Sequence, residues 1–242
     1  SRKPAGALTL RTGNQRMKFT KTNDAGIHDL GFVVHSESGG GKTRMCATTG
    51  APDETVIISA EGGLLSLRDH AITAIEVATL ADVYAAYDWL ADSDEARGIK
   101  WICIDSISEI AEVVLAHEKK ENKNTMRAYG QMADQMTGLI RAFRDIGGRH
   151  VYMTCKQERV QLEDGSMLYG PSMPGKNLTN SLAYFFDEVF CLHVHTDEEG
   201  NIQRWLQTSA NGTHVAKDRS GALELYEPCD LSHIAKKILG ES

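Results

Sequence analysis

The stretch Ser36-Glu37-Ser38-Gly39-Gly40-Gly41-Lys42-Thr43 decides the fold of this chain. It follows an apolar run at residues 31–35 and leads into a helix-compatible segment that ends at Thr49. This order of elements is typical of a phosphate-binding loop: a strand, a glycine-rich turn, a Lys-Thr pair and a helix. The glycines let backbone N–H groups converge on an anion. We therefore predict a nucleotide site that consists of Ser38, Gly39, Gly40, Gly41, Lys42, Thr43 and Arg44.

The last two residues of the cradle have separate roles. The Lys42 ammonium can reach the β- and γ-phosphates of ATP, and the Thr43 hydroxyl can ligate Mg²⁺. The usual pattern, G-x-x-x-x-G-K-[ST], begins with glycine, whereas this chain has Ser36 at that position. Because serine lacks the φ/ψ freedom of glycine, this difference bears on hydrolysis more than on binding. The alternative is a glycine-rich hairpin turn without a ligand.

A second motif is an apolar strand that ends in an acid, Lys100-Trp101-Ile102-Cys103-Ile104-Asp105-Ser106. A carboxylate about 60 residues beyond the cradle lysine, in a chain that alternates strands with helices, can complete a Mg²⁺ site together with the cradle hydroxyl. We therefore predict Thr43 and Asp105 as metal residues, with ATP and Mg²⁺ as cofactors.

The composition is that of an ordinary globular protein, with 242 residues, 41% hydrophobic and 24% charged. We find neither a secretory signal nor an apolar window of the roughly 18 residues that a membrane span needs, so we expect a cytoplasmic protein without a membrane partner. The five cysteines form no C-x-x-C pair, which favours reduced thiols over structural zinc. His193 and His195 share one face of a strand, but two ligands without a third do not make a metal site.

The charge is unevenly distributed. The chain as a whole carries −7, but residues 114–180 hold ten Lys/Arg against seven Asp/Glu, and residues 1–23 hold six Lys/Arg and no acid. Local basic surface, rather than whole-chain charge, is what binding to a nucleic-acid backbone requires. We expect residues 1–24 to form a basic arm, which either contacts DNA or is a solvated tail.

The remaining chain alternates strands and helices. We expect strands at 55–60, 72–77 and 150–154, and helices at 80–91, 107–122, 129–146 and 230–239. Residues 117–124 form a charged, flexible patch, and the Gly/Pro-punctuated stretch 158–178 is expected to be a functional loop or disordered. Residues 189–195 and 202–208 predict a hairpin. The fold class is therefore α/β, with a mostly parallel central sheet flanked by helices and a C-terminal antiparallel hairpin, in one core domain at 25–242.

Residues 30–225 resemble the RecA-type P-loop ATPase core. The resemblance rests on three features together: Gly41-Lys42-Thr43, Glu61 after the next strand, and Ile104-Asp105-Ser106. In RecA-like proteins the glutamate that activates water lies at the end of the strand after the phosphate loop. The resemblance thus implies that Glu61 is the general base, and Ser106 in place of a glutamate fits that arrangement. The alternative is that Glu61 is an idle residue in a glycine-rich turn.

The resemblance also implies further site residues. The γ-phosphate sensor would be Gln157, with Thr154 as the alternative. Lys217 and Arg219 lie in a segment similar to the basic finger that reaches the γ-phosphate of a neighbouring subunit, which implies a homo-oligomer, either a ring or a filament. Loops that line the DNA channel in RecA correspond to 117–128 and 158–178, so the candidates for DNA binding are Lys119, Lys120, Lys123, Arg159, Tyr169 and Lys176. Tyr169 would stack on a base, with plain loop packing as the alternative.

The compact core, with Pro174-Gly175-Lys176 and Phe186-Asp187-Glu188-Val189, resembles phage-encoded RecA-core ATPases, some of which are single-strand annealing recombinases. The implied function is a DNA-stimulated ATPase that binds single-stranded DNA and promotes annealing or strand exchange in homologous recombination. A single-strand-binding protein is a further expected partner, and a phage protein would act in the host cytoplasm. The alternatives are a helicase-like motor and a non-catalytic, ATP-gated assembly scaffold.

Overall fold

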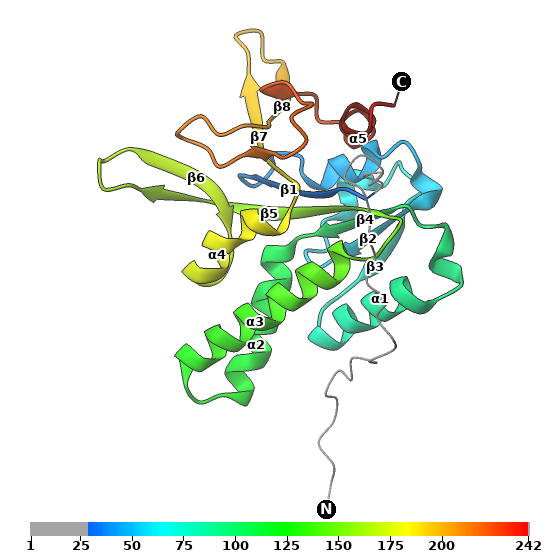
Figure 1. Ribbon diagram of the computed structural model, residues 1–242, viewed down its shortest axis with the longest axis vertical. Helices are drawn as coiled ribbons and strands as arrows, with labels where there is room; N and C mark the ends of the chain where they lie inside the picture. Colours follow the sequence, from blue (N-terminus) through cyan, green and yellow to red (C-terminus); the bar gives the residue numbers. More distant parts are fainter. Residues whose placement is uncertain (1–28, 242) are drawn as a thin grey trace, which may run out of the picture.

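A central sheet with six parallel strands organises the computed structural model, which describes residues 29–241 (Figure 1). The parallel strands follow the order β7-β1-β5-β4-β2-β3, and their register is parallel at every step. Their bounds are β1 Gly31–Ser36, β2 Thr55–Ser59, β3 Thr73–Glu76, β4 Trp101–Asp105, β5 His150–Gln161 and β7 Glu188–Thr196. This is the mostly parallel α/β sheet that the sequence predicts.

Antiparallel strands extend this sheet. β8 (Ile202–Gln207) pairs with β7 and forms the predicted C-terminal hairpin, and β10 (Tyr226–Glu227) pairs with β8. β6 (Met167–Ser172) pairs with the distal half of β5, and β9 (Lys217–Asp218) pairs with the first residues of β7.

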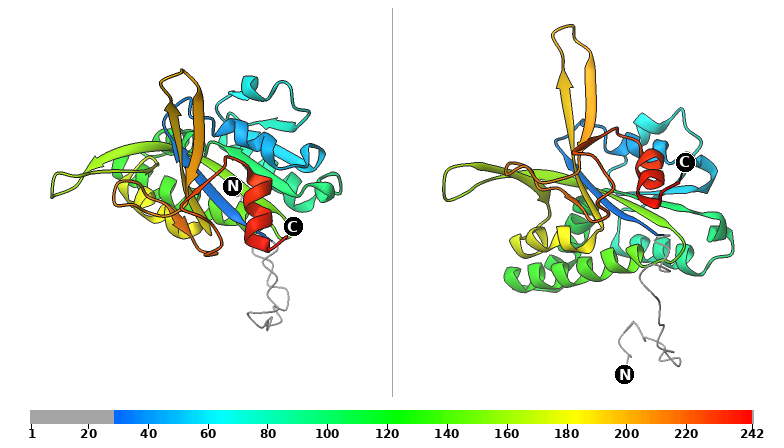
Figure 2. Two further views of the ribbon diagram at one scale, coloured as in Figure 1. Left: turned by 90° about the horizontal axis from the view of Figure 1, so that it is seen from above. Right: turned by 45° about the horizontal axis from the view of Figure 1, so that its top comes forward.

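Helices cover both faces of the sheet, because the central strands are apolar on both sides. On one face, α1 (Leu80–Asp92), α2 (Ile107–Glu121) and α3 (Thr125–Arg144) pack over Val33, Ile58 and Ile104. On the other face, α5 (Leu231–Leu239) and a 3₁₀ turn at Thr43–Thr48 pack over Phe32 and Tyr152. Figure 2 shows α5 on the side of the sheet opposite to α2 and α3.

Local sequence explains where these helices begin. Thr79 and Asp82 form the predicted capping box of α1, in which each side chain accepts a hydrogen bond from the other residue's backbone N–H. Ser106 caps α2, Asn124 caps α3 and Asp230 caps α5. Each of these side chains accepts from an N–H group that would otherwise have no partner in the first turn.

The stretch 158–178 differs from its prediction. β5 continues to Gln161, turns at Gly165 with φ +83°, and returns as β6, with Arg159 opposite Tyr169. The prediction of a loop or disorder is wrong, because Gly170-Pro171 does not break the strand: proline is tolerated on an edge strand such as β6. The short helix α4 (Lys176–Leu182) follows.

Two smaller differences concern helices. The segment after the phosphate loop is a 3₁₀ turn instead of an α-helix, and the Thr48 hydroxyl donates to the backbone oxygen of Met45. Such a side-chain bond competes with helical hydrogen bonds. The predicted flexible patch at 117–124 belongs in large part to α2, which runs to Glu121.

The predicted arm at residues 1–24 lies outside the described residues. Within residues 29–241, no helix has the length and apolar character that crossing a bilayer requires.

The strand order positions the functional site. β1 lies between β5 and β7, and from β1 the chain crosses over β5 and β4 to β2. In open parallel sheets, ligands bind at the carboxyl ends of the strands, where the strand order reverses. The phosphate loop leaves the carboxyl end of β1, and Asp105 ends β4, so both lie at this edge.

Candidate nucleotide-binding site

A cleft of about 780 Å³ opens at the carboxyl edge of the sheet. This volume is in the range that small-molecule and cofactor sites occupy. Its walls contain every residue predicted for nucleotide binding, together with Glu61, Asp105 and Gln157. The lining residues are Ser36, Glu37, Ser38, Gly39, Gly40, Gly41, Lys42, Thr43, Arg44, Glu61, Ser66, Asp105, Lys156, Gln157 and Arg204.

The loop needs its glycines for two different reasons. Gly39 and Gly41 have φ angles of +77° and +111°, a region that residues with a Cβ rarely adopt. Gly40 has an ordinary φ, but a Cβ on it would lie 2.4 Å from the Ser36 Oγ. A side chain at any of these positions would strain the backbone or collide with Ser36, so the loop conformation depends on its glycines.

Lys42 folds back over the loop. Its Nζ donates to the backbone oxygens of Ser36 and Glu37 at 2.9 and 3.2 Å, and to the Ser36 Oγ at 3.0 Å. Burial lowers the pKa of Lys42, and the carboxylates of Glu61 and Asp105 partly oppose this shift. The three oxygens that accept these hydrogen bonds are neutral, so a phosphate would supply the negative charge that a half-buried ammonium favours.

Thr43 and Asp105 meet at the bottom of the cleft. The Thr43 hydroxyl donates to Asp105 Oδ2 at 2.7 Å, and the Thr154 hydroxyl donates to Asp105 Oδ1. Asp105 is 2% exposed and comes from β4, whereas Thr154 comes from β5. The three oxygen-bearing side chains thus form one chain of hydrogen bonds from the phosphate loop across to the neighbouring strands.

Glu61 lies two residues beyond the end of β2 and faces the same cleft. The Ser106 hydroxyl donates to Glu61 Oε1, so Ser106 holds the carboxylate near Asp105. Glu61 is exposed to solvent, as a group that takes a proton from water must be.

This donor set fits ATP with Mg²⁺. Hard oxygens, here a hydroxyl and a carboxylate, are the ligands that Mg²⁺ takes, usually with waters and phosphate oxygens in the remaining positions. Thr43 and Asp105 would hold the ion, which would neutralise charge on the phosphates. Lys42 and the loop backbone would bind the phosphates, and Glu61 would orient and deprotonate the attacking water.

The comparison with known families agrees with this geometry. The family described as AAA domain matches residues 29–220, which is most of the chain. The chain belongs to this family. Membership indicates a P-loop ATPase fold, and the match begins before β1 and includes the phosphate loop, Asp105 and β5. A search of curated proteins gave no match.

The two sensor candidates of this AAA domain differ in position. Thr154 is fully buried and bonded to Asp105, so it supports the metal residue. Gln157 lines the cleft and lies next to His35, whose Nδ1 is 2.9 Å from the Gln157 amide. Gln157 is therefore the one of the two that a γ-phosphate can contact, and its role as a sensor stays a prediction.

Arg204 lines the cleft and was not predicted. It comes from β8, and its Nε donates to the backbone oxygen of Gly40 at 2.9 Å. Nothing in the local sequence marks Arg204, because it is 164 residues from Gly40 and is exposed on its strand. Its guanidinium adds a further cation to the cleft that Lys42, Arg44 and Lys156 also line.

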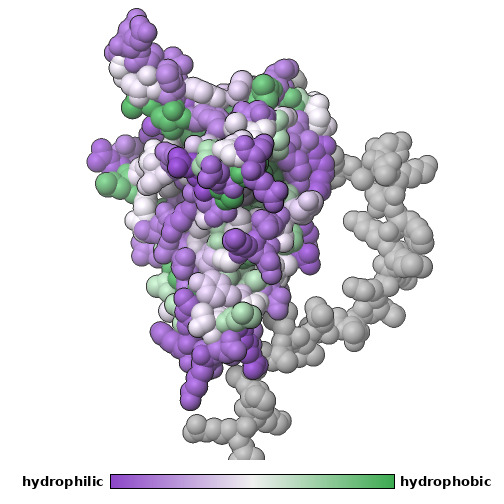
Figure 3. Space-filling view, turned by 90° about the vertical axis from the view of Figure 1, so that its left-hand side faces the viewer, coloured by the Kyte–Doolittle hydropathy of each residue, from purple (hydrophilic) through white to green (hydrophobic). Residues whose placement is uncertain are grey.

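The predicted DNA-binding residues lie on three neighbouring structures. Lys119 and Lys120 end α2, Lys123 is in the turn to α3, Arg159 and Tyr169 face each other on the β5–β6 hairpin, and Lys176 begins α4. Figure 1 shows all three structures on its left-hand side, and Figure 3 shows that this face is largely hydrophilic. Tyr169 stacks on His214 with ring centroids 4.9 Å apart.

Lys217 and Arg219 lie at the other edge of the sheet. β9 pairs with Glu188 and Val189 at the amino end of β7, far from the loop that leaves the carboxyl end of β1. Lys217 Nζ donates to the backbone oxygens of Ala183 and Phe186, and Arg219 pairs with Asp187 at 2.8 Å. Neither residue reaches the phosphate loop of its own chain, and a role toward a neighbouring subunit stays a prediction.

Proposed function

We propose that this protein is an ATP- and Mg²⁺-dependent, RecA-like ATPase that binds single-stranded DNA and promotes annealing or strand exchange in homologous recombination. The observation that supports a RecA-like mechanism is the position of Glu61. The carboxylate enters the cleft from the end of β2, whereas the position after Asp105 carries Ser106, which holds Glu61 by a hydrogen bond.

A DNA surface on the hairpin side is the second part of the proposal. β5 contributes Gln157 to the nucleotide cleft, and the same strand continues to Arg159 in the β5–β6 hairpin. One strand thus connects the phosphate site to the proposed DNA site. A shift of this strand on ATP binding would change the DNA surface, and by linkage bound DNA would then change the affinity for ATP.

The proposed active unit is a homo-oligomer, a ring or a filament, in which Arg219 approaches the nucleotide of the next subunit. Arginine delivered in trans accelerates related phosphoryl transfers by roughly 10³–10⁵. Arg219 is exposed at the surface, where it pairs with Asp187, so it is accessible to a second copy.

The decisive experiment measures binding of a labelled single-stranded oligonucleotide by anisotropy, with and without ATP, over a range of salt concentrations. Replacing Lys119, Lys120 and Lys123 by alanine removes three exposed cations, so log K should fall less steeply with log salt, by about 2 in slope. Lys236→Ala, on α5 across the sheet, is the matched control and should leave the slope unchanged.

Three outcomes separate the functions. Annealing of complementary strands without unwinding supports the recombinase. Unwinding of a duplex indicates the motor instead. ATP binding without hydrolysis or DNA binding indicates the assembly scaffold and overturns the proposal.

A further inference from the structure

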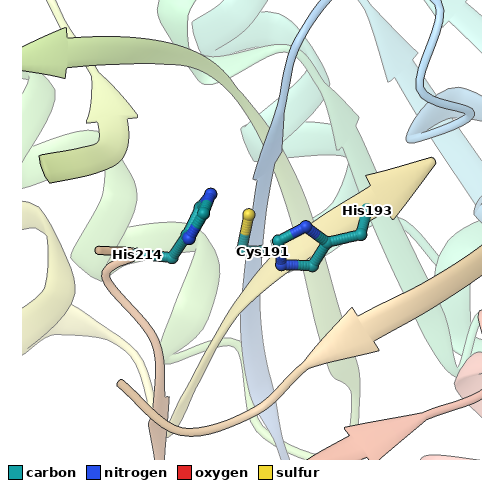
Figure 4. Close-up of side chains that lie close together, drawn as sticks. All are labelled: Cys191, His193 and His214. Atoms are coloured by element: carbon teal, nitrogen blue, oxygen red, sulfur yellow. The ribbon is translucent and has the colours of Figure 1, made fainter. Parts of the chain in front are cut away.

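Cys191, His193 and His214 converge next to the phosphate loop (Figure 4). One potential ligand atom from each residue lies within 4.8 Å of the other two. Cys191 and His193 point to the same side of β7, because residues two apart on a strand share a face. His214 comes from the segment between β8 and β9, and Figure 4 shows Cys191 between the two imidazole rings.

Hydrogen bonds fix the tautomer of His193. The Gln207 Nε2 donates to the backbone oxygen of Ser209, which orients this amide so that its Oε1 lies 2.9 Å from His193 Nε2. An amide oxygen can only accept, so Nε2 of His193 carries the proton. The Nδ1 atom of the neutral ring then has the free lone pair.

The same logic applies to His214. The Thr213 hydroxyl donates to Asn211 Oδ1, so its oxygen accepts from His214 Nδ1 at 2.9 Å. The Asn211 oxygen is identified independently, because it accepts the backbone N–H groups of Thr213 and His214. Nε2 of His214 therefore has the free lone pair, and both rings are prepared as ligands by an outer hydrogen bond.

The thiol of Cys191 is also positioned for a metal. Cys191 is 1% exposed, and its Sγ–H donates to Gln157 Oε1 at 3.4 Å. Coordination to a metal ion would replace this weak hydrogen bond with a metal–sulfur bond.

We propose that Cys191, His193 and His214 bind a divalent transition metal, with Zn²⁺ as the preferred ion. One thiolate and two imidazoles are ligands that Zn²⁺ takes, and three protein ligands leave a fourth position for water. Binding displaces the thiol proton to solvent. The site opens into a cleft of about 410 Å³ that Ser36, Glu37, Ser38, Gly39 and Gly40 also line.

The ion would join segments that are distant in the chain. It would tie the 208–216 segment to β7 beside the phosphate loop, and it would fix His214 under Tyr169. The bound metal ion would thereby stabilise a surface that lies between the nucleotide cleft and the base of the β5–β6 hairpin. This site is separate from the Mg²⁺ site at Thr43 and Asp105, because its ligands are sulfur and nitrogen rather than oxygen.

The test is a titration of the metal-free, reduced full chain with Co²⁺, followed by competition with Zn²⁺. Tetrahedral Co²⁺ with a thiolate ligand gives a ligand-to-metal charge-transfer band and intense visible bands, which a surface histidine does not give. We expect one equivalent of Co²⁺ with both features, displaced by one equivalent of Zn²⁺. Cys191→Ser should abolish the charge-transfer band, and His214→Gln should weaken binding by roughly 10-fold or more.

Matched controls exclude other sites. Cys229→Ser removes a different half-buried thiol, and His195→Gln removes an exposed imidazole on the same strand. Both variants should bind Co²⁺ as the parent does. His214 is half-buried on a connecting segment, so His214→Gln tests the site without disturbing the core. Absence of a thiolate band in the parent, or unchanged binding in His214→Gln, would overturn the proposal.

Discussion

Glu188 provides a quantitative test of the packing around β7 and β9. It is 1% exposed, and its Oε1 accepts the backbone N–H of Ser220 at 3.3 Å. Burial and the neighbouring Asp218 carboxylate raise the pKa of Glu188 to about 8, whereas hydrogen bonds from the Ser220 hydroxyl and from backbone N–H groups of Gly221 and Leu223 lower the pKa of Asp218. Near neutral pH, Glu188 therefore carries a proton in the folded protein.

The sign of the effect on stability follows from this raised pKa. In the unfolded chain Glu188 has an ordinary pKa near 4.5, so between about pH 4.5 and 8 the folded state binds the extra proton. The stabilising contribution is complete below pH 4.5 and is lost as the pH rises through 8. At 1.36 kcal/mol per pH unit, the loss between pH 5 and pH 8.5 is up to roughly 4 kcal/mol.

Glu188→Gln keeps the shape and removes the titration. We expect the free energy of unfolding of the variant to exceed that of the parent at pH 8.5 by roughly 2 to 4 kcal/mol, and the two to agree within about 1 kcal/mol at pH 5. Urea denaturation at several pH values measures both. His35, whose pKa is lowered to about 4, makes a pH-dependent contribution of opposite sign to the free energy of unfolding. This contribution is the same in both proteins, so it cancels in the difference between their free energies of unfolding.

Glu198→Gln, on the exposed turn of the β7–β8 hairpin, is the matched control and should show no pH-dependent difference. A Glu188→Gln variant whose stability follows that of the parent at every pH would refute the reasoning. It would mean that Glu188 is ionised in the folded protein and that a partner offsets the free-energy cost of burying its charge.

Two further predictions concern the nucleotide cleft. Glu61→Gln should bind ATP as the parent does and hydrolyse it about 10²–10⁴-fold more slowly, because it removes the base but keeps the hydrogen bond from Ser106. Phosphate release measures the rate of hydrolysis, and an unchanged rate would remove Glu61 from the mechanism. Gly40→Ala should weaken ATP binding by roughly 10-fold or more, since its Cβ would lie 2.4 Å from the Ser36 Oγ. Gly63→Ala, with no atom within 4 Å of the added Cβ, is the matched control, and equal affinities in calorimetry would contradict a tight loop.

The parts of the site that are encoded locally could be predicted from sequence. The phosphate loop and Asp105 each follow an apolar strand, and parallel strands bring such ends to one edge of a sheet. The role of Glu61 was implied by the resemblance to RecA-like ATPases, and the structure places Glu61 two residues beyond the end of β2, in the same cleft.

Residues that enter the site across long distances in the chain could not be found in this way. Arg204 reaches Gly40 through the fold of the β7–β8 hairpin, and His214 joins Cys191 only because the segment before β9 folds back on β7. The sequence analysis found no third ligand for His193 and His195, and the residues that converge in the structure are Cys191, His193 and His214. The β5–β6 hairpin was missed because its pairing compensates for a glycine and a proline that locally oppose a strand.

The most direct test of the central claim is calorimetric titration of Lys42→Ala with ATP and Mg²⁺, beside the parent protein. A charge-assisted hydrogen bond contributes about 1.5–3 kcal/mol, so losing the ammonium should weaken ATP binding by roughly 10- to 150-fold. That result would place the triphosphate on the loop before Lys42. Undiminished affinity would contradict the account, because the triphosphate would then be bound elsewhere and Thr43, Asp105 and Glu61 would lose their assigned roles.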